Sequence, residues 1–259
     1  MTRIFHAAIA LLVVFILAPI VVVVVASFSA KAIPEFPPSE WSVRWYAHAL
    51  SQPIFTDSAV NSAWLALVST ALATPIAMGV AYVIVRFDFR GKDALQTFML
   101  SPLIVPSIVI GLAILLAFAT IGIKGVGLRL IGAHVLITFP YLVRTIMASM
   151  ARVDLTVEEA AKTLGANGLR TFWHITLPLV RPGIIAGMLF SFIVSFDNVS
   201  VSLFLTSART NTLPLAILNY VEYNFDPSVA AISTMLILFS LSAAVLLERA
   251  VGLRRVVGV

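Results

Sequence analysis

The sequence has no cysteine and few charged residues: only 11% of its 259 residues are Asp, Glu, Lys or Arg. Without cysteine the chain can form neither a disulfide nor a thiolate metal site. Soluble domains carry roughly 25% charged residues. This chain is instead 60% hydrophobic, with a mean hydropathy of +1.04. A water-facing globular domain is therefore excluded, and lipid must be the solvent for most of the chain.

Backbone groups in hydrocarbon must be satisfied within the protein, which leaves helices or a closed barrel. A membrane barrel would show short segments of alternating polarity. The sequence has long unbroken apolar runs instead. We therefore predict an all-α membrane protein.

Six segments approach the length of about 20 apolar residues that a helix needs to cross a bilayer. The predicted spans are 4–29, 58–85, 94–123, 130–150, 182–206 and 227–247. The fourth contains Arg144, which should snorkel or face protein. The first resembles a signal peptide, but its apolar run exceeds the roughly 7–15 residues of a signal core, so we favour a retained helix. We interpret 1–259 as a single transmembrane domain.

Lysine and arginine set the orientation of such a chain. With the N-terminus inside, twelve of the seventeen cations fall in inside segments: Arg3, Arg86, Arg90, Lys92, Arg144, Arg152, Lys162, Arg170, Arg181, Arg249, Arg254 and Arg255. The outside segments hold Lys31, Arg44, Lys124, Arg129 and Arg209. This bias predicts that both termini are cytoplasmic. It also accounts for the net charge of +5 without a nucleic-acid partner.

The first predicted outside loop, 30–57, combines prolines at its start with three aromatic residues. Trp41, Trp45 and Tyr46 are spaced for one face of a short helix. Such a face is typical of the aromatic belt at a membrane interface. A docking surface for another protein is the alternative.

The longest predicted cytoplasmic connection, 151–177, has a helix–turn–helix pattern. Thr156 is the expected N-cap, and Glu159 completes a capping box. Glu158 and Glu159 also lie in the first turn, where the helix dipole favours anions. Gly165 is placed as a left-handed C-terminal cap.

A turn and a second helix complete this connection. Asn167 and Gly168 favour the turn. A short helix, 171–176, should then lead to Pro178 at the start of the next span.

One spacing in this connection resembles the EAA loop of permeases in binding-protein-dependent ATP-driven (ABC) importers. The matching positions, in order and without a gap, are Glu159, Ala160, Ala161, Gly165, Ile175, Leu177 and Pro178. The loop lies between the fourth and fifth of six predicted spans. The ends of the second span are similar to the same family at Asn61, Ser62, Gly79, Ala81, Tyr82 and Arg86. The resemblance covers about 58–247.

The resemblance implies a type I importer permease in the bacterial inner membrane. In that family the EAA loop is a coupling helix that rests in a cleft of the ATPase subunit. Ala160 and Ala161 permit close approach, Gly165 ends the helix, and Glu159 offers a polar contact. A purely structural interpretation has Glu159 only capping and the alanines only favouring helix.

The expected partners also follow from the resemblance. The chain has no GxxxxGK[ST] loop for phosphate, so ATP and Mg²⁺ should be bound by two partner ATP-binding subunits. A second permease and a periplasmic solute-binding protein complete the expected complex, surrounded by membrane lipid. We expect no cofactor and no catalytic site in this chain. A stand-alone secondary transporter is the weaker alternative, because it should carry several intramembrane ionisable groups and a repeated topology.

Three short segments together resemble the spermidine/putrescine branch of the family: 101–106, 195–198 and 212–215. That branch commonly has an acid after the second proline of the third span and two adjacent acids in the fifth. This chain has Ser107 and Asn198 at two of those positions, and only Asp197 remains. Fewer carboxylates compensate less positive charge in a low dielectric. We predict a small polar, amine-bearing solute, with an amino-acid derivative, an opine, a phosphonate or iron as alternatives.

The candidate pathway residues lie in the third and fifth predicted spans: Pro102, Pro106, Ser195, Asp197 and Asn198. An ionisable residue inside a span is a functional candidate. For Asp197, the open alternative is an ion pair with Arg144. Pro102 and Pro106 should kink or open the third helix, either for a pathway or for packing.

Two further patterns concern the fifth span and the histidines. On one continuous helix, four polar residues would form a stripe: Ser191, Ser195, Asn198 and Ser202. His134 and His174 stand alone in the sequence, without the paired spacing of a metal site.

Overall fold

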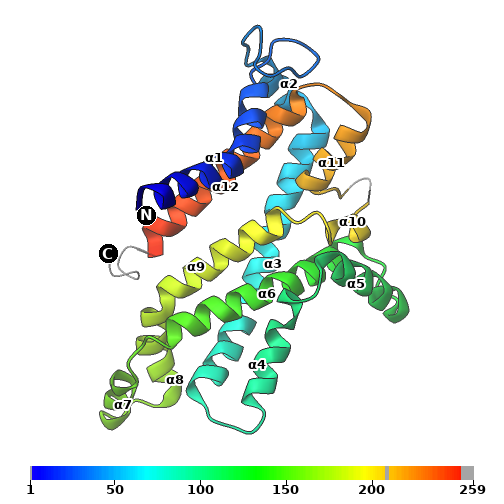
Figure 1. Cartoon of the computed structure of the whole chain (residues 1–259). Helices are drawn as coiled ribbons and strands as arrows, with labels where there is room; N and C mark the ends of the chain where they lie inside the picture. The colour runs from blue at the N-terminus through cyan, green and yellow to red at the C-terminus, as the bar shows by residue number, and fades with distance from the viewer. Residues whose placement is uncertain (1, 208–209, 252–259) are drawn as a thin grey trace. The chain divides into compact units, whose positions relative to one another are not determined.

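A computed structural model describes residues 2–207 and 210–251. The regular secondary structure of those residues is helical, with one isolated bridge between Ser29 and Trp41 and no strand (Figure 1). The helices are α1 Thr2–Ala26, α2 Arg44–Ser51, α3 Pro53–Arg86, α4 Lys92–Leu100, α5 Ser107–Ile121, α6 Val126–Met150, α7 Leu155–Thr163, α8 Gly168–Thr171, α9 Leu177–Phe196, α10 Ser202–Leu205, α11 Leu213–Tyr223 and α12 Ser228–Val251. A 3₁₀ turn, Ser101–Leu103, follows α4, and a π-helical turn, Phe172–Thr176, joins α8 to α9. Arg209, Arg254 and Arg255, used above for orientation, lie outside the described residues.

Five helical segments in the described part of the chain are long and apolar enough to cross a membrane. They are Phe5–Ala26, Pro53–Arg86, Val126–Met150, Gly168–Phe196 and Ser228–Leu246. A sixth forms if the bent pair Lys92–Leu103 and Ser107–Ile121 counts as one span. The predicted all-α fold is confirmed, and the predicted six apolar spans are confirmed when the bent pair is counted as one span.

The third span is broken where its two prolines stand. Pro102 lies in the 3₁₀ turn and Pro106 is the N-cap of α5, and the two halves of the span meet at 101°. Each proline lacks an N–H group and disfavours helix at the residue before it. The predicted opening of this helix is confirmed.

The fifth span differs from its predicted range, 182–206. The helix is continuous from Gly168, through the π-helical turn and past Pro178, and it ends at Phe196. It ends there because the side-chain oxygen of Asn198 accepts a hydrogen bond from the Val201 amide, at 2.9 Å, in place of helix continuation. The stripe expected on one continuous helix is therefore wrong, since Asn198 and Ser202 lie beyond the helix end.

The described residues form two compact units. One comprises the chain up to Ala59 together with Leu215–Leu241, and the other comprises Val60–Pro214 and the described residues from Ser242 onward.

The first unit contains α1 and a loop that packs on its own aromatic residues. Phe28 lies 5.4 Å from the ring of Tyr46, and Ser27 hydrogen-bonds the Tyr46 hydroxyl at 2.6 Å. The Trp45 indole donates to the Lys31 carbonyl at 3.2 Å and is buried, whereas Trp41 is exposed. Trp41 lies before α2, so the three aromatic residues do not share one face of a short helix as the sequence predicted.

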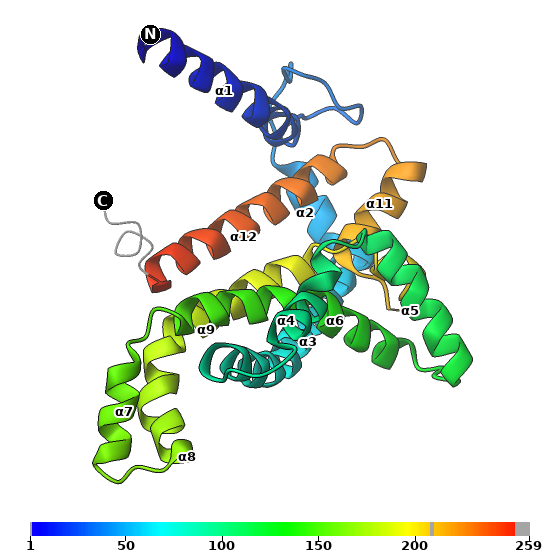
Figure 2. The same cartoon turned by 60° about the horizontal axis from the view of Figure 1, so that its bottom comes forward.

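The second unit is organised around α6 and α9, which lie side by side (Figures 1 and 2). Small residues allow the close approach. A Cβ atom at Gly183 would overlap Ser149 of α6, and one at Gly187 would lie 3.3 Å from Leu142. This Gly-xxx-Gly spacing, typical of closely packed membrane helices, was missed in the sequence.

The core of this unit joins three spans. Its buried residues come from α3, α6 and α9: Ala73, Ala77, Met78, Ala81, Leu142, Val143, Ile146, Met150 and Val180. The small alanines of α3 and the larger side chains of α6 belong to the same buried cluster.

Candidate coupling segment and buried polar seam

Helix α7 has its N-cap two residues earlier than predicted. Asp154 is the N-cap, and its carboxylate accepts a hydrogen bond from the Thr156 amide at 2.9 Å. That bond holds the pKa of Asp154 below its usual value. The predicted capping box of Thr156 and Glu159 is therefore wrong, because aspartate is at least as good a cap and stands two residues earlier.

The end of α7 has the predicted left-handed glycine. Gly165 has φ +89°. Its amide donates to the Lys162 carbonyl, and the Ala166 amide donates to the Ala161 carbonyl, both at 3.0 Å. These two bonds form a Schellman motif, which satisfies the last carbonyls of the helix.

A turn follows and starts α8. Asn167 caps α8 by accepting from the Arg170 amide at 2.8 Å, as its turn-forming character predicts. The second helix was predicted over 171–176 and in fact runs from Gly168 into α9 without a break. Figure 2 shows α7 and α8 projecting together beyond the ends of α6 and α9.

Much of this α7–α8 hairpin is exposed. Glu159, Ala160, Gly165 and Pro178 are exposed, while Ala161, Ile175 and Leu177 are half-buried. The hairpin also exposes large apolar side chains: Leu155, Val157, Leu164, Leu169 and Trp173. The hairpin therefore presents both apolar surface and a free carboxylate.

The neighbouring acid, Glu158, has the opposite environment. Its carboxylate oxygen Oε1 accepts from Nη2 and Nε of Arg86, at 2.8 and 3.1 Å, and from the Thr176 hydroxyl at 3.0 Å. The side chains of Arg86 and Glu158 are only 6% and 4% exposed. Sequence reasoning treated Glu158 as a helix-dipole residue and missed this pair. The available signals were the doubled acid and the arginine that ends the second span.

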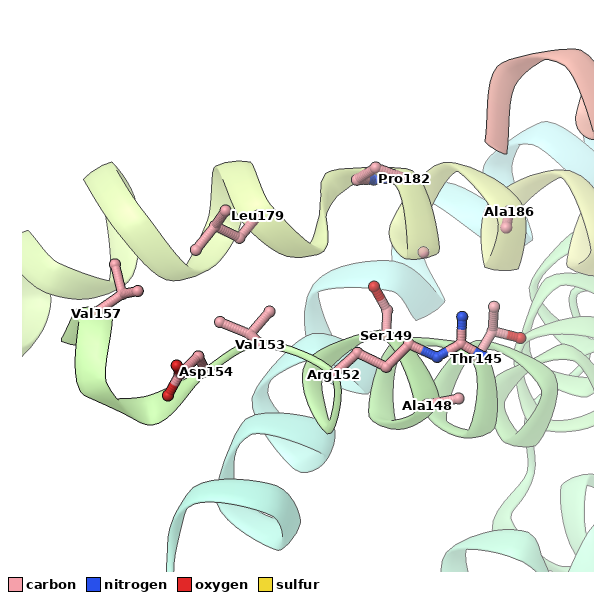
Figure 3. A pocket seen from close by; sticks show the side chains of 11 residues that line it. Thr145, Ala148, Ser149, Arg152, Val153, Asp154, Val157, Leu179, Pro182 and Ala186 are labelled. Carbon is pink, nitrogen blue, oxygen red and sulfur yellow. The ribbon is translucent and has the colours of Figure 1, made fainter. Parts of the chain in front are cut away.

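An open cleft of about 580 Å³ lies beside the base of the hairpin, between α6, the start of α7 and α9 (Figure 3). Its walls are mostly apolar, and Leu179 of α9 points towards Val153 across it (Figure 3). The polar lining groups belong to Thr145, Ser149, Arg152 and Asp154.

The predicted pathway residues do not gather in one place. Asp197 is the C-cap of α9 and is exposed, whereas Ser195 is buried and Asn198 is half-buried. Among the described residues Asp197 makes no ion pair with Arg144, so the structural pairing considered above is wrong. Pro102 and Pro106 stand at the break of the third span.

Ser195 instead belongs to a buried polar seam around His134, which comprises His134 and Thr138 of α6 and Ser191, Ser195 and Ser202. The Ser202 hydroxyl donates to the Asn198 carbonyl at 2.9 Å, so it accepts from Nε2 of His134, at 3.2 Å. In a neutral imidazole Nδ1 then lacks a proton and accepts from the Ser195 hydroxyl at 2.8 Å. Each group is satisfied with a neutral imidazole.

The seam explains how the chain continues after α9. Through Ser195 and Ser202, His134 holds both the end of α9 and the start of α10. At Gly111 of α5, a Cβ atom would lie 3.0 Å from Val201, so α5 also packs closely here. The second half of the third span, α5, therefore packs on the chain that follows α9.

The broken and continuous apolar helices, with a capped helical hairpin projecting beyond two of them, define a polytopic helical membrane protein. Residues 72–252 match the family described as "Binding-protein-dependent transport system inner membrane component". The chain belongs to this family, and it is a multi-pass permease subunit of an ABC importer.

Curated relatives cover most of the chain. It is 33% identical to the spermidine/putrescine transport system permease protein PotC of Haemophilus influenzae, over 80% of each chain. It is 30% identical to the putrescine transport system permease protein PotI of Escherichia coli, over 86% of this chain and 82% of that one. A ferric transport system permease protein, FbpB of Actinobacillus pleuropneumoniae, is 29% identical over 78% of this chain and 31% of its own length.

Solved structures share the fold at low sequence identity. A bacterial ABC transporter that imports the acidic polysaccharide alginate matches with a TM-score of 0.71 and 16% identity, over 95% of this chain and 96% of that one. The MetNI methionine ABC transporter in inward-facing conformations matches with a TM-score of 0.63 and 15% identity, over 76% and 94%.

Proposed function

We propose that this permease moves a small polar, amine-bearing, polyamine-like solute from periplasm to cytoplasm, and that the α7–α8 hairpin couples this movement to ATP hydrolysis on partner subunits. The observation that carries the proposal is the projecting hairpin, with an exposed Glu159, an exposed Ala160 and a left-handed Gly165. A short rigid helix with small residues and a free carboxylate is suited to sit in a protein cleft.

The coupling residues in this proposal are those of the EAA spacing: Glu159, Ala160, Ala161, Gly165, Ile175, Leu177 and Pro178. The exposed apolar side chains of the hairpin would supply the buried centre of the contact, and Glu159 a polar contact at its edge. Because α8, the π-helical turn and α9 form one continuous helix, a push on the hairpin would pass directly to a membrane span. Rigid-body motion of this kind is a common switching device.

The complex would contain two ATP-binding subunits, a second homologous permease and a periplasmic solute-binding protein. ATP and Mg²⁺ would be held by the ATP-binding subunits, with this chain in the bacterial inner membrane and both termini cytoplasmic. The relatives named for spermidine and putrescine transport support this arrangement.

For the solute, Asp197 is the proposed pathway residue. Its exposed carboxylate stands where α9 ends, and a charge there would attract an amine in a low dielectric. Asn198, which follows it in the chain, would add a polar group, and the break at Pro102 and Pro106 would be a separate part of the pathway. Ser195, whose hydroxyl is engaged by His134, would support the pathway rather than contact the solute.

Iron is the second candidate solute, because a ferric permease is also similar to most of this chain. Amino-acid derivatives, opines and phosphonates remain chemically compatible with one carboxylate. The ligand of the cognate solute-binding protein decides among them. A thermal-shift screen of that protein should show stabilisation by putrescine or spermidine, and stabilisation by ferric iron alone would contradict the amine assignment.

Coupling is tested by co-purification with the cognate ATP-binding subunit. Glu159→Ala and Gly165→Val should remain in the membrane and lose solute uptake, with weakened retention of the ATP-binding subunit. Lys124→Ala, in a predicted outside loop, is the matched control and should retain both. Normal uptake with wild-type retention in the two hairpin variants would remove the hairpin from the mechanism.

A further inference from the structure

We propose that Arg86, Glu158 and Thr176 form a buried strut that fixes the angle of the hairpin, so that Glu158 is the positioning residue of the coupling segment and Glu159 its contact residue. This inference rests on the proposed function of the hairpin and assigns separate roles to its two adjacent acids.

The strut joins three elements that are distant in sequence. Arg86 is the last residue of α3, Glu158 lies in the first turn of α7, and Thr176 ends the π-helical turn before α9. All three hydrogen bonds, at 2.8, 3.1 and 3.0 Å, converge on one carboxylate oxygen of Glu158. One atom therefore ties the hairpin to two spans.

Burial makes these bonds directional and costly to break. The two charged side chains are 6% and 4% exposed, and Thr176 is fully buried. A buried charge that loses its partner is strongly destabilised, because its desolvation is no longer compensated. The hairpin can therefore rotate away from α3 only by exposing or orphaning Arg86.

The position of the strut fits force transmission. Helix α7 is short and otherwise packs on α8 and the π-helical turn, both of which belong to its own chain connection. A helix of nine residues is marginal in isolation. The bond from Arg86 gives it a fixed point on a long membrane helix, so that a push on α7 moves α3 and α9 together instead of bending the hairpin.

The two acids are therefore separated by environment as well as by sequence. Glu158 is buried and its Oε1 accepts three hydrogen bonds, whereas Glu159 is exposed. Consecutive helical residues point about 100° apart, so one acid can hold the hairpin while the next remains free for a partner.

The test is a distance measurement in the full-length permease in lipid nanodiscs. The chain has no cysteine, so spin labels can be attached at only two introduced cysteines: Ile76→Cys on α3 and Lys162→Cys on α7, both exposed. The strut predicts a narrow distance distribution that Glu159→Gln leaves unchanged. Glu158→Gln should broaden the distribution and shift its mean.

A paired variant keeps the test decisive if Glu158→Gln does not fold. Arg86→Met with Glu158→Gln removes both charges and retains an acceptor for Thr176, and such paired replacements are commonly tolerated. The proposal predicts normal membrane insertion and a broad distribution for this pair. A distribution as narrow as wild type, in either the single or the paired variant, would overturn the strut.

The outcome is independent of the proposed coupling to ATPases, because the distances are measured in the permease alone. Adding the ATP-binding subunits then separates the two roles. Glu159→Gln should weaken their binding at an unchanged label distance, whereas Glu158→Gln should retain binding and lose uptake. A permease with an intact strut that binds no ATP-binding subunit would refute the proposed function and leave the strut standing.

Discussion

The second unit contains two buried polar networks with different chemistry. At the base of the hairpin, Arg86 and Glu158 form an ion pair, in which Arg86 donates two hydrogen bonds to Oε1 of Glu158. In the seam, His134 is hydrogen-bonded to the uncharged hydroxyl groups of Ser195 and Ser202. Removing one partner of a buried ion pair is strongly destabilising, because the other charge stays buried and uncompensated. Hydrogen bonds between neutral side chains in a membrane contribute less to stability, about 0.6 kcal/mol each on average. The comparison indicates that the hairpin is fixed by electrostatics, and the span breaks by shape and many weak bonds.

The largest effect should come from breaking the charged network. Arg86→Ala leaves Glu158 buried without its cation, and we expect a loss of about 3–5 kcal/mol in unfolding free energy. Chemical unfolding of the purified permease in detergent measures it. A loss as small as that of a surface substitution would show that water already reaches the pair.

The next largest loss of stability should come from overpacking the contact between α6 and α9. Gly183→Ala places a methyl group onto Ser149, and overpacking of this kind costs about 1–3 kcal/mol. Ser149→Gly in the same chain should restore stability by vacating the space. Gly187→Ala, whose new atom would lie 3.3 Å from Leu142, is the milder control. Failure of the paired change to rescue would contradict the helix contact.

The neutral network should be less sensitive. His134→Leu removes two hydrogen bonds and leaves the Ser195 hydroxyl without its partner, and we expect a loss of about 1–2 kcal/mol. Ser202→Ala, which removes one acceptor, should cost less. Thermal unfolding of both variants checks the order, and a loss for His134→Leu equal to that for Arg86→Ala would erase the distinction between the networks.

The smallest effect should be a loss of stability at the start of α7 at low pH. The folded-state pKa of Asp154 is lowered by the Thr156 amide. Its contribution to stability is therefore present above the usual aspartate pKa and is lost as the pH falls through the lowered folded value. Amide exchange in α7, corrected for intrinsic rates, should accelerate in that acid range. Asp154→Asn should flatten this pH dependence, and an equal acceleration in the variant would exclude Asp154 as the titrating cap.

Composition and spacing were enough to predict the six spans, the break at Pro102 and Pro106 and the left-handed Gly165. Each of these is encoded locally: apolar length, missing N–H groups and a backbone conformation that favours glycine. Asp154 was missed as a cap because Thr156 offered a competing pattern within two residues. Which of the two residues caps the helix depends on where the chain leaves α6, and no local sequence pattern predicts that position.

The networks themselves were beyond local reasoning. Glu158 meets Arg86 across 72 residues, and His134 meets Ser195 across 61. The end of α9 at Phe196 was also missed, because Asp197 and Asn198 were placed inside the span, whereas the Asn198 side chain interrupts the helix. Polar residues inside apolar runs were recognised as significant, but their partners become evident only when the helices are packed.

The π-helical turn Phe172–Thr176 has one more consequence. A wide turn accommodates an extra residue relative to an α-helix, and each α-helical residue advances the chain by about 100°. These five residues therefore set the rotational phase between α8 and the membrane helix that follows. Deleting one of them would keep the helix continuous but rotate the hairpin about the helix axis, so that its exposed residues face another direction.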